Sequence, residues 1–208
     1  DAIDQLVGCG EQDIDALRSF RKKHKDWLFG AMAYELKDQF EKLSSLHADK
    51  FKIEPIRYFI PRFLFILQNN NWRLLYNGER SIEVILKEIR STEIINNPSD
   101  AGHLHVGMPK LEYEKKLRKI KDHIQRGDIY EMNFCQEFYS VDAQIDPLQV
   151  FRDLCRRSLP PFSAFFKWDT QYLLCASPER YLKMKDGHLL SQPIKGTRPR
   201  NPDPSIDL

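Results

Sequence analysis

Residues 177–200 read SPERYLKMKDGHLLSQPIKGTRPR and place two extended runs around one turn. The run that starts at Arg180 alternates charged with apolar side chains, as a strand with one solvent-facing side does. Asp186-Gly187 predicts a two-residue hairpin turn, because such a turn needs the positive φ that glycine tolerates. The returning strand is His188 to Gln192, and the apolar run Tyr172 to Ala176 lies before the motif. Together these runs predict an antiparallel meander.

The same residues form a candidate site. The meander places Glu179 and Lys195 near neighbouring strand ends, and a carboxylate is a natural general acid or base. A lysine becomes a nucleophile when desolvation lowers its pKa well below the reference of about 10.4. The neighbour of Lys195 in the sequence, Ile194, is apolar and offers it no polar contact. Gly196 lets the backbone approach a ligand, and Thr197 can bind a carboxylate. On residue types alone, the simpler interpretation is a surface hairpin with solvated charges.

Two motifs carry a family resemblance. One is SPER (177–180) followed by PIKGTRPR (193–200), and the other is IQRGDIYEMNF (124–134). In this order they resemble the chorismate-using enzymes, which include anthranilate synthase component I, aminodeoxychorismate synthase component I, and the isochorismate and salicylate synthases. Glu131 departs from the glutamine that is usual in the second motif. The resemblance is strong from about Tyr113 to Pro204 and weaker from Trp27.

The residue after Pro193-Ile194 separates two activities in this family. Anthranilate synthases typically carry alanine there and aminodeoxychorismate synthases carry lysine, which is Lys195 in this chain. The resemblance therefore implies the conversion of chorismate and ammonia to 4-amino-4-deoxychorismate, for para-aminobenzoate and folate synthesis. The alternatives are anthranilate synthesis and a non-catalytic scaffold subunit.

The resemblance also implies a mechanism and a set of binding partners. Lys195 would attack C2 of chorismate as the C4 hydroxyl leaves, and ammonia would then enter at C4 and expel the lysine. Glu179 would shuttle the proton, while Gly196 and Thr197 would hold a substrate carboxylate. Similar enzymes bind chorismate with Mg²⁺. A glutamine amidotransferase subunit normally supplies their ammonia.

Composition excludes several other classes. The net charge is +2 in 208 residues, and acidic residues are interleaved with basic ones, so nothing calls for a nucleic-acid partner. The four cysteines are widely scattered without metal-ligand spacing, which indicates reduced thiols in a cytoplasmic protein. His103 and His105 lack an evident third metal ligand and are interpreted as solvated loop residues. The sequence shows no apolar run long enough to span a bilayer, so no membrane partner is expected.

The chain as a whole predicts an α+β fold, with antiparallel sheets stacked as a sandwich and helices outside. Residues 1–95 are expected to form an N-terminal lobe, 96–108 a linker, and 109–208 the first part of the catalytic region. Trp27 to Tyr34 is a continuous apolar run and predicts a strand buried on both faces. Residues 128–140 are expected to run into a strand. Helices are predicted from Gln12 to His24, Ser81 to Ser91, Pro109 to Gly127 and Pro147 to Ser158.

The family continues for about as much again beyond Leu208. That further portion carries the glutamates that bind Mg²⁺, so no metal ligand is expected within these 208 residues. The fold is therefore expected to be incomplete in this chain. We expect residues 1–208 alone to be unable to turn over chorismate.

Overall fold

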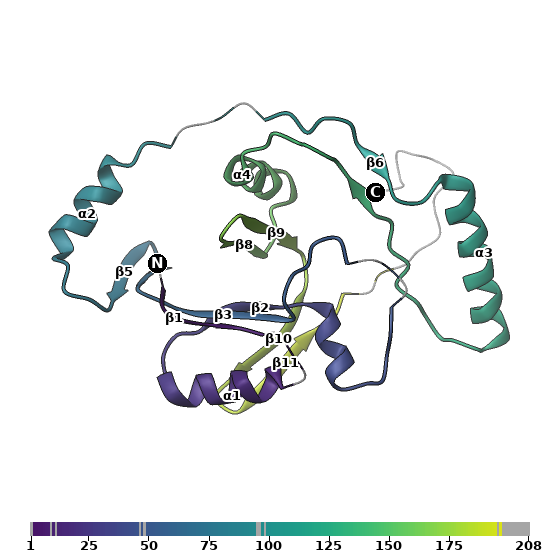
Figure 1. Ribbon diagram of the computed structural model, residues 1–208, viewed down its shortest axis with the longest axis horizontal. Coiled ribbons are helices and arrows are strands. Elements are labelled where there is room, and N and C mark those ends of the chain that lie inside the picture. The colour runs from purple at the N-terminus through teal and green to yellow at the C-terminus, as the bar shows by residue number, and fades with distance from the viewer. Residues whose placement is uncertain are drawn as a thin grey trace. The chain divides into compact units, whose positions relative to one another are not determined.

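The computed structural model describes residues 2–8, 10, 12–45, 47, 49–94, 97, 99–194 and 196 (Figure 1). The chain divides into two compact units, which are residues 1–93 (unit 1) and 94–208 (unit 2). Each strand pair among the described residues is antiparallel, and helices lie between the strands along the chain. This pairing confirms the predicted α+β class with antiparallel sheets.

Unit 1 holds a sheet in the order β1-β3-β2 and a separate hairpin, β4-β5. Asn69 and Asn70 both have positive φ, at 50° and 63°, and form the turn of that hairpin. The described elements of unit 1 are β1 (Ala2–Val7), α1 (Asp13–His24), β2 (Phe29–Met32), the 3₁₀ helix η1 (Tyr34–Gln39), β3 (Ile56–Pro61), β4 (Phe63–Gln68), β5 (Asn71–Tyr76) and α2 (Ile82–Ser91).

The core of unit 1 centres on the middle strand, β3. Its Ile56 and Ile60 are only 0% and 2% exposed, and Phe20 of α1 and Leu36 of η1 are also buried. Burying one such side chain contributes about 1.5–3 kcal/mol relative to leaving it exposed. The carboxylate of Asp13 is buried as well, and it accepts hydrogen bonds from the Gly10 N–H at 3.2 Å and the Gln39 amide at 3.1 Å. The start of α1 is therefore held by a satisfied buried carboxylate.

The apolar run from Trp27 to Tyr34 is not a strand buried on both faces, so this prediction was wrong. Only Phe29–Met32 is extended, and β2 lies at the edge of its sheet, paired with β3. Three of its four residues are exposed. An apolar run indicates extended structure, but the number of neighbouring strands depends on the rest of the fold.

Unit 2 is built from short strand pairs and two longer helices. Its pairs are β6-β7, β8-β9 and β10-β11. The described elements are β6 (His105–Val106), α3 (Lys110–Arg126), β7 (Phe138–Tyr139), α4 (Pro147–Ser158), β8 (Phe162–Trp168), β9 (Gln171–Ser177), β10 (Arg180–Lys185) and β11 (His188–Gln192). None of the described residues of unit 2 is fully buried.

Side chains and one glycine cap three of the helix ends, and the glycine, Gly127, is the end that the sequence predicted. Ser81 accepts a hydrogen bond from the Val84 N–H at 3.4 Å, and Asp146 caps α4 just before Pro147. Gly127 ends α3 in the left-handed region, with φ 80°. The four predicted helices are therefore confirmed.

Two predictions for the middle of the chain need correction. Within residues 128–140 only β7 is extended, and it pairs with β6, so most of this segment is irregular. His105 is a member of β6, and its ring stacks on Tyr139 at 5.1 Å, so it is not a solvated loop residue. Asp100 bridges to Gln144, which means that described residues of the segment 96–108 pair within unit 2.

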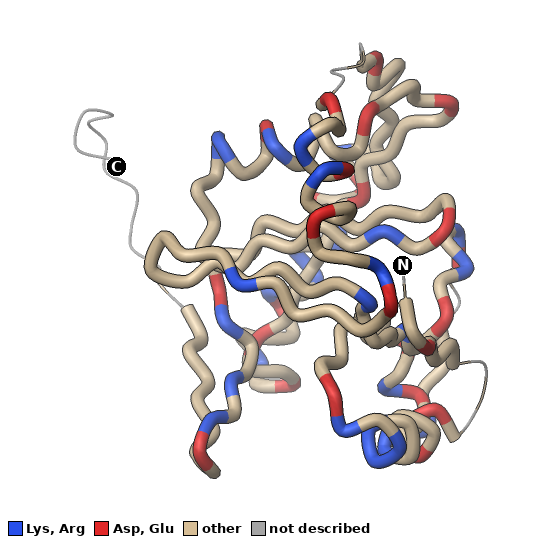
Figure 2. The backbone as a smooth tube through the Cα atoms, turned by 90° about the vertical axis from the view of Figure 1, so that its left-hand side faces the viewer, with Lys and Arg blue, Asp and Glu red and all other residues tan. Residues whose placement is uncertain are grey.

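Charged residues are distributed along the whole chain. Figure 2 shows Lys and Arg interleaved with Asp and Glu rather than gathered into one stripe. Among the described residues, no helix is long and apolar enough to cross a membrane.

Candidate active site

Two hairpins of unit 2 carry the SPER motif between them. β8 pairs with β9 from Phe162 opposite Ser177 to Trp168 opposite Gln171. β10 pairs with β11 from Arg180 opposite Gln192 to Lys185 opposite His188. The sequence predicted one meander in which the strand after the motif returns along the strand before it. That pairing was wrong, because β9 and β10 belong to different two-stranded sheets.

The turn of the second hairpin was predicted correctly. Asp186 and Gly187 have φ angles of 50° and 77°, the positive values that a two-residue turn between twisted strands requires. The turn sets the register of β10 and β11 from Lys185 to Lys183, and after a register shift Arg180 lies opposite Gln192.

The backbone of Glu179 is fixed by its neighbour Ser177. The Glu179 N–H donates to the Ser177 hydroxyl at 3.2 Å, and the same hydroxyl donates to the Glu179 carbonyl at 3.0 Å. The Glu179 side chain is exposed. Ser177 therefore holds the candidate acid/base residue in a tight local turn while its carboxylate remains accessible.

Arg180 occupies the junction between the two hairpins. Its guanidinium carbon lies 4.5 Å from the centre of the Phe162 ring, and its Nε–H donates to Oε1 of Gln192 at 3.0 Å. One side chain thus contacts the first residue of β8 and the last residue of β11. The sequence contained Arg180 in a recognised motif, but its partners are distant in sequence, so sequence reasoning assigned it no role.

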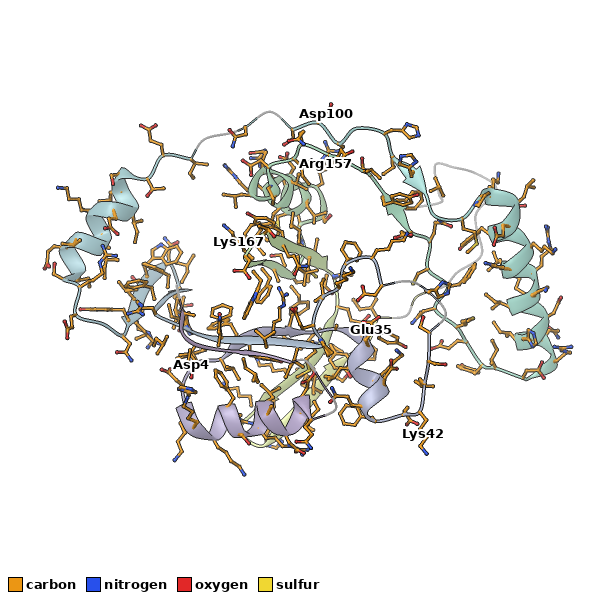
Figure 3. All side chains as sticks on the ribbon, in the orientation of Figure 1. Asp4, Glu35, Lys42, Asp100, Arg157 and Lys167 are labelled. Carbon is orange, nitrogen blue, oxygen red and sulfur yellow. The ribbon has the colours of Figure 1, made fainter. Side chains whose placement is uncertain are left out.

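Helix α4 supports the first hairpin. Phe151 contacts Phe165 of β8 with ring centres 5.4 Å apart, and Phe165 contacts Tyr172 of β9 at 5.9 Å. Lys167, labelled in Figure 3, lies over the Tyr172 ring at 5.6 Å. At the start of this helix, the Asp146 carboxylate accepts hydrogen bonds that lower its pKa, and the bond from the Gln149 N–H is the largest cause. The hairpin that leads into Ser177 is therefore anchored on α4.

The predicted site residues differ in what the structure says of them. Glu179 lies on the link between the hairpins, as described above. Gly196 is exposed, and a Cβ added there would meet nothing within 4 Å. Lys195 and Thr197 lie outside the described residues.

The second motif, residues 124–134, has a structural role at its start. After Gly127, the Asp128 N–H donates back to the His123 carbonyl at 3.0 Å, and its carboxylate accepts from Arg126 at 2.8 Å. These contacts close the end of α3. Further along, Phe134 stacks on Tyr113 of α3 at 4.9 Å, and Tyr130 is 92% exposed.

Possible metal ligands are scattered through the described residues. In the part of the chain that the structure describes, no three His, Cys, Asp or Glu side chains gather to hold a metal ion. Glu179 therefore belongs to no such group of three, and the described residues do not fit a Mg²⁺ site.

Comparisons with known proteins agree with the motifs. The sequence model of the chorismate binding enzymes matches residues 6–208. Aminodeoxychorismate synthase component 1 of Klebsiella aerogenes is 40% identical over 100 residues, which are 48% of this chain and 22% of that protein. Anthranilate synthase component 1 of Saccharolobus solfataricus is 25% identical over 189 residues, which are 88% of this chain and 42% of that protein.

A solved structure gives the same result for the fold. Anthranilate synthase component I from Streptococcus pneumoniae superposes with a TM-score of 0.73 at 16% identity, over 91% of this chain and 51% of that one. This likeness confirms the predicted fold. The chain thus spans about half of that structure and less than half of these two curated relatives. Because the family match runs through nearly all of its residues, the chain belongs to the family of chorismate binding enzymes.

Proposed function

We propose that this chain is part of an aminodeoxychorismate synthase component I, which replaces the C4 hydroxyl of chorismate with an amine. The observation that carries the proposal is Lys195 in the PIKGT motif, at the position that separates this activity from anthranilate synthesis. Relatives with that name, from Klebsiella aerogenes and Salmonella typhimurium, are 40% and 38% identical over 100 residues.

In the proposed reaction Lys195 attacks C2 of the ring, both ring double bonds shift towards C4, and the C4 hydroxyl leaves. Ammonia then attacks C4, both double bonds shift back, and the bond from C2 to the lysine nitrogen breaks. Glu179 gives a proton to the leaving hydroxyl and takes one from the entering ammonia. Gly196 and Thr197 hold a substrate carboxylate.

The register of the second hairpin supports this pairing of residues. Arg180 lies opposite Gln192, so the chain leaves β11 beside the link that carries Glu179. Lys195 follows Gln192 by three residues in the sequence, so the proposal requires only this short stretch of chain to reach the link that carries Glu179.

The proposal includes Mg²⁺ and a glutamine amidotransferase subunit that supplies ammonia, as in similar enzymes. No step is assigned to the metal, because the described residues offer no ligand set for it. The cytoplasm is the proposed compartment, in line with three free thiols at Cys135, Cys155 and Cys175.

Anthranilate synthesis is the second candidate. It is favoured by the Saccharolobus solfataricus alignment, which extends over 88% of the chain. The identity in that alignment is lower than in the shorter match to aminodeoxychorismate synthases, at 25% against 40%. A scaffold subunit without catalysis remains the third candidate.

The decisive experiment gives the complete gene product chorismate, Mg²⁺ and ammonium and identifies the product by mass spectrometry. We expect a product that retains the enolpyruvyl group and carries an amine in place of the hydroxyl, and we expect Lys195→Ala to lower its formation far more than any anthranilate formation. Anthranilate with released pyruvate would support the second candidate. Unchanged chorismate would support the scaffold.

A further inference from the structure

Four strand ends meet at the SPER motif. Phe162 and Ser177 are paired at the open end of the β8-β9 hairpin, and Arg180 and Gln192 are paired at the open end of the β10-β11 hairpin. Between Ser177, which ends β9, and Arg180, which begins β10, lie only Pro178 and Glu179. Glu179 is therefore on a two-residue link whose direction depends on the angle between two hairpins that share no sheet.

One side chain contacts both hairpins at this link. The Arg180 guanidinium stacks over Phe162 at 4.5 Å, and its Nε–H donates to Gln192 at 3.0 Å. We call these three residues the Arg180 clamp. A guanidinium is planar, so it can stack through its face and donate a hydrogen bond through its edge at the same time. Lysine carries the same charge but cannot do both in this geometry.

The clamp acts where the β10-β11 ladder is irregular. The register shifts between Arg180 and Lys183, so the strand ladder alone leaves the start of β10 loosely defined. The Arg180 to Gln192 hydrogen bond closes the ladder beyond this irregularity. Ser177 fixes the backbone of Glu179 on the other side of the link.

We propose that the Arg180 clamp is a positioning device for Glu179. It sets the angle between the two hairpins, and so sets where the Glu179 carboxylate stands relative to the chain that leaves β11 towards Lys195. This inference rests on the proposed function, in which Glu179 transfers the proton. Arg180, Phe162 and Gln192 are positioning residues, since each acts through Glu179.

The kinetic test uses the complete enzyme with chorismate and ammonium. Arg180→Lys, Phe162→Leu and Gln192→Met are each made in the parent and in Glu179→Gln. In the parent we expect kcat to fall roughly 10- to 100-fold with little change in KM, because a misplaced catalytic group costs about this much. In Glu179→Gln the same changes should lower the remaining rate less than about twofold, because the group they position is gone. Equal losses in both backgrounds would overturn the proposal.

A second measurement does not depend on the reaction. Nitroxide labels are attached to unnatural amino acids at Thr170 and Lys185, near the tips of the two hairpins. Pulsed electron paramagnetic resonance then measures the distance between the two labels. Arg180→Lys should broaden and shift this distance distribution. The matched control is Arg157→Lys, the same exchange in the last turn of α4, which should leave the distribution unchanged.

The two measurements separate the two proposals. If the complete enzyme makes anthranilate or leaves chorismate unchanged, the proposed function fails, and the distance distribution still decides the clamp. An unchanged distribution in Arg180→Lys would overturn the clamp whatever the reaction is.

Discussion

Asp4 contacts the side chains of two residues at the end of the neighbouring helix. Its carboxylate is 2.9 Å from the Lys23 ammonium and 2.8 Å from Nε2 of His24, and Figure 3 labels Asp4 on β1. The Lys23 hydrogen bond is the main cause that lowers the pKa of Asp4 from 3.8 to about 2, followed by the Gln5 N–H. Asp4 thereby ties the end of α1 to the first strand.

This pKa predicts how stability depends on pH. The folded value lies below the unfolded one, so the contribution of ionised Asp4 is complete above about pH 4 and is lost as the pH falls from there towards about 2. In urea unfolding of the complete enzyme, the midpoint urea concentration should fall more over this pH range for the parent than for Asp4→Asn. Parallel losses in parent and variant would contradict the assignment.

At the scale of single elements, the end of α3 offers a test of backbone conformation. Gly127 has φ 80° and its added Cβ would meet nothing within 4 Å, so conformation alone decides the cost of a side chain. Gly127→Ala should lower the free energy of unfolding by about 1 kcal/mol, and Gly127→Asn by less. The matched control is Gly10→Ala, where a Cβ also meets nothing and φ is not positive.

The measurement is the midpoint of thermal or urea unfolding of the three variants in the complete enzyme. Equal stability of Gly127→Ala and Gly10→Ala would mean that the left-handed backbone at the end of α3 does not affect the free energy of unfolding. In that case Asp128, which also closes this helix end, would be the residue to change next.

Local signals in the sequence predicted the elements well. Asp186-Gly187 predicted the hairpin turn, Gly127 the end of α3 and Pro147 the start of α4, because each of these features depends on the backbone preferences of adjacent residues. Strand pairing is not local. β9 and β10 do not pair although only two residues separate them, and β2 lies at a sheet edge, and neither fact can be seen in the residues of those strands.

The candidate site divides in the same way. Glu179 was found from its motif and lies on an exposed link, and its role in chemistry stays a prediction, as does that of Gly196. The contact of Arg180 with Phe162 could not be predicted, because it joins two hairpins and the sequence of neither hairpin indicates how the other packs against it. Lys195 and Thr197 stay predictions.

For the whole molecule, the exposed apolar surface of the site-bearing hairpin predicts what residues 1–208 can do alone. Tyr181 of β10 and Leu189 of β11 are 88% and 67% exposed, and no described residue of unit 2 is fully buried. Catalysis of this kind needs a site from which water is excluded. We expect the isolated 208-residue chain to show no turnover of chorismate by mass spectrometry, under conditions in which the complete enzyme is active. Measurable turnover by the isolated chain would contradict this expectation.

The sheet of unit 1 has a consequence for the order of events during synthesis. β1 pairs with β3, from Ala2 opposite Pro61 to Val7 opposite Arg57, so the first strand has no partner until β3 has been made. At the usual rate of about 5–20 residues per second, the ribosome takes roughly 3–12 s to cover that interval. The β4-β5 hairpin has its two strands joined by a two-asparagine turn and can close as soon as it emerges. The strands of that hairpin follow each other directly, whereas β1 waits through the whole interval before β3 is made, so β1 is the segment of unit 1 that nascent-chain chaperones have the longest time to bind.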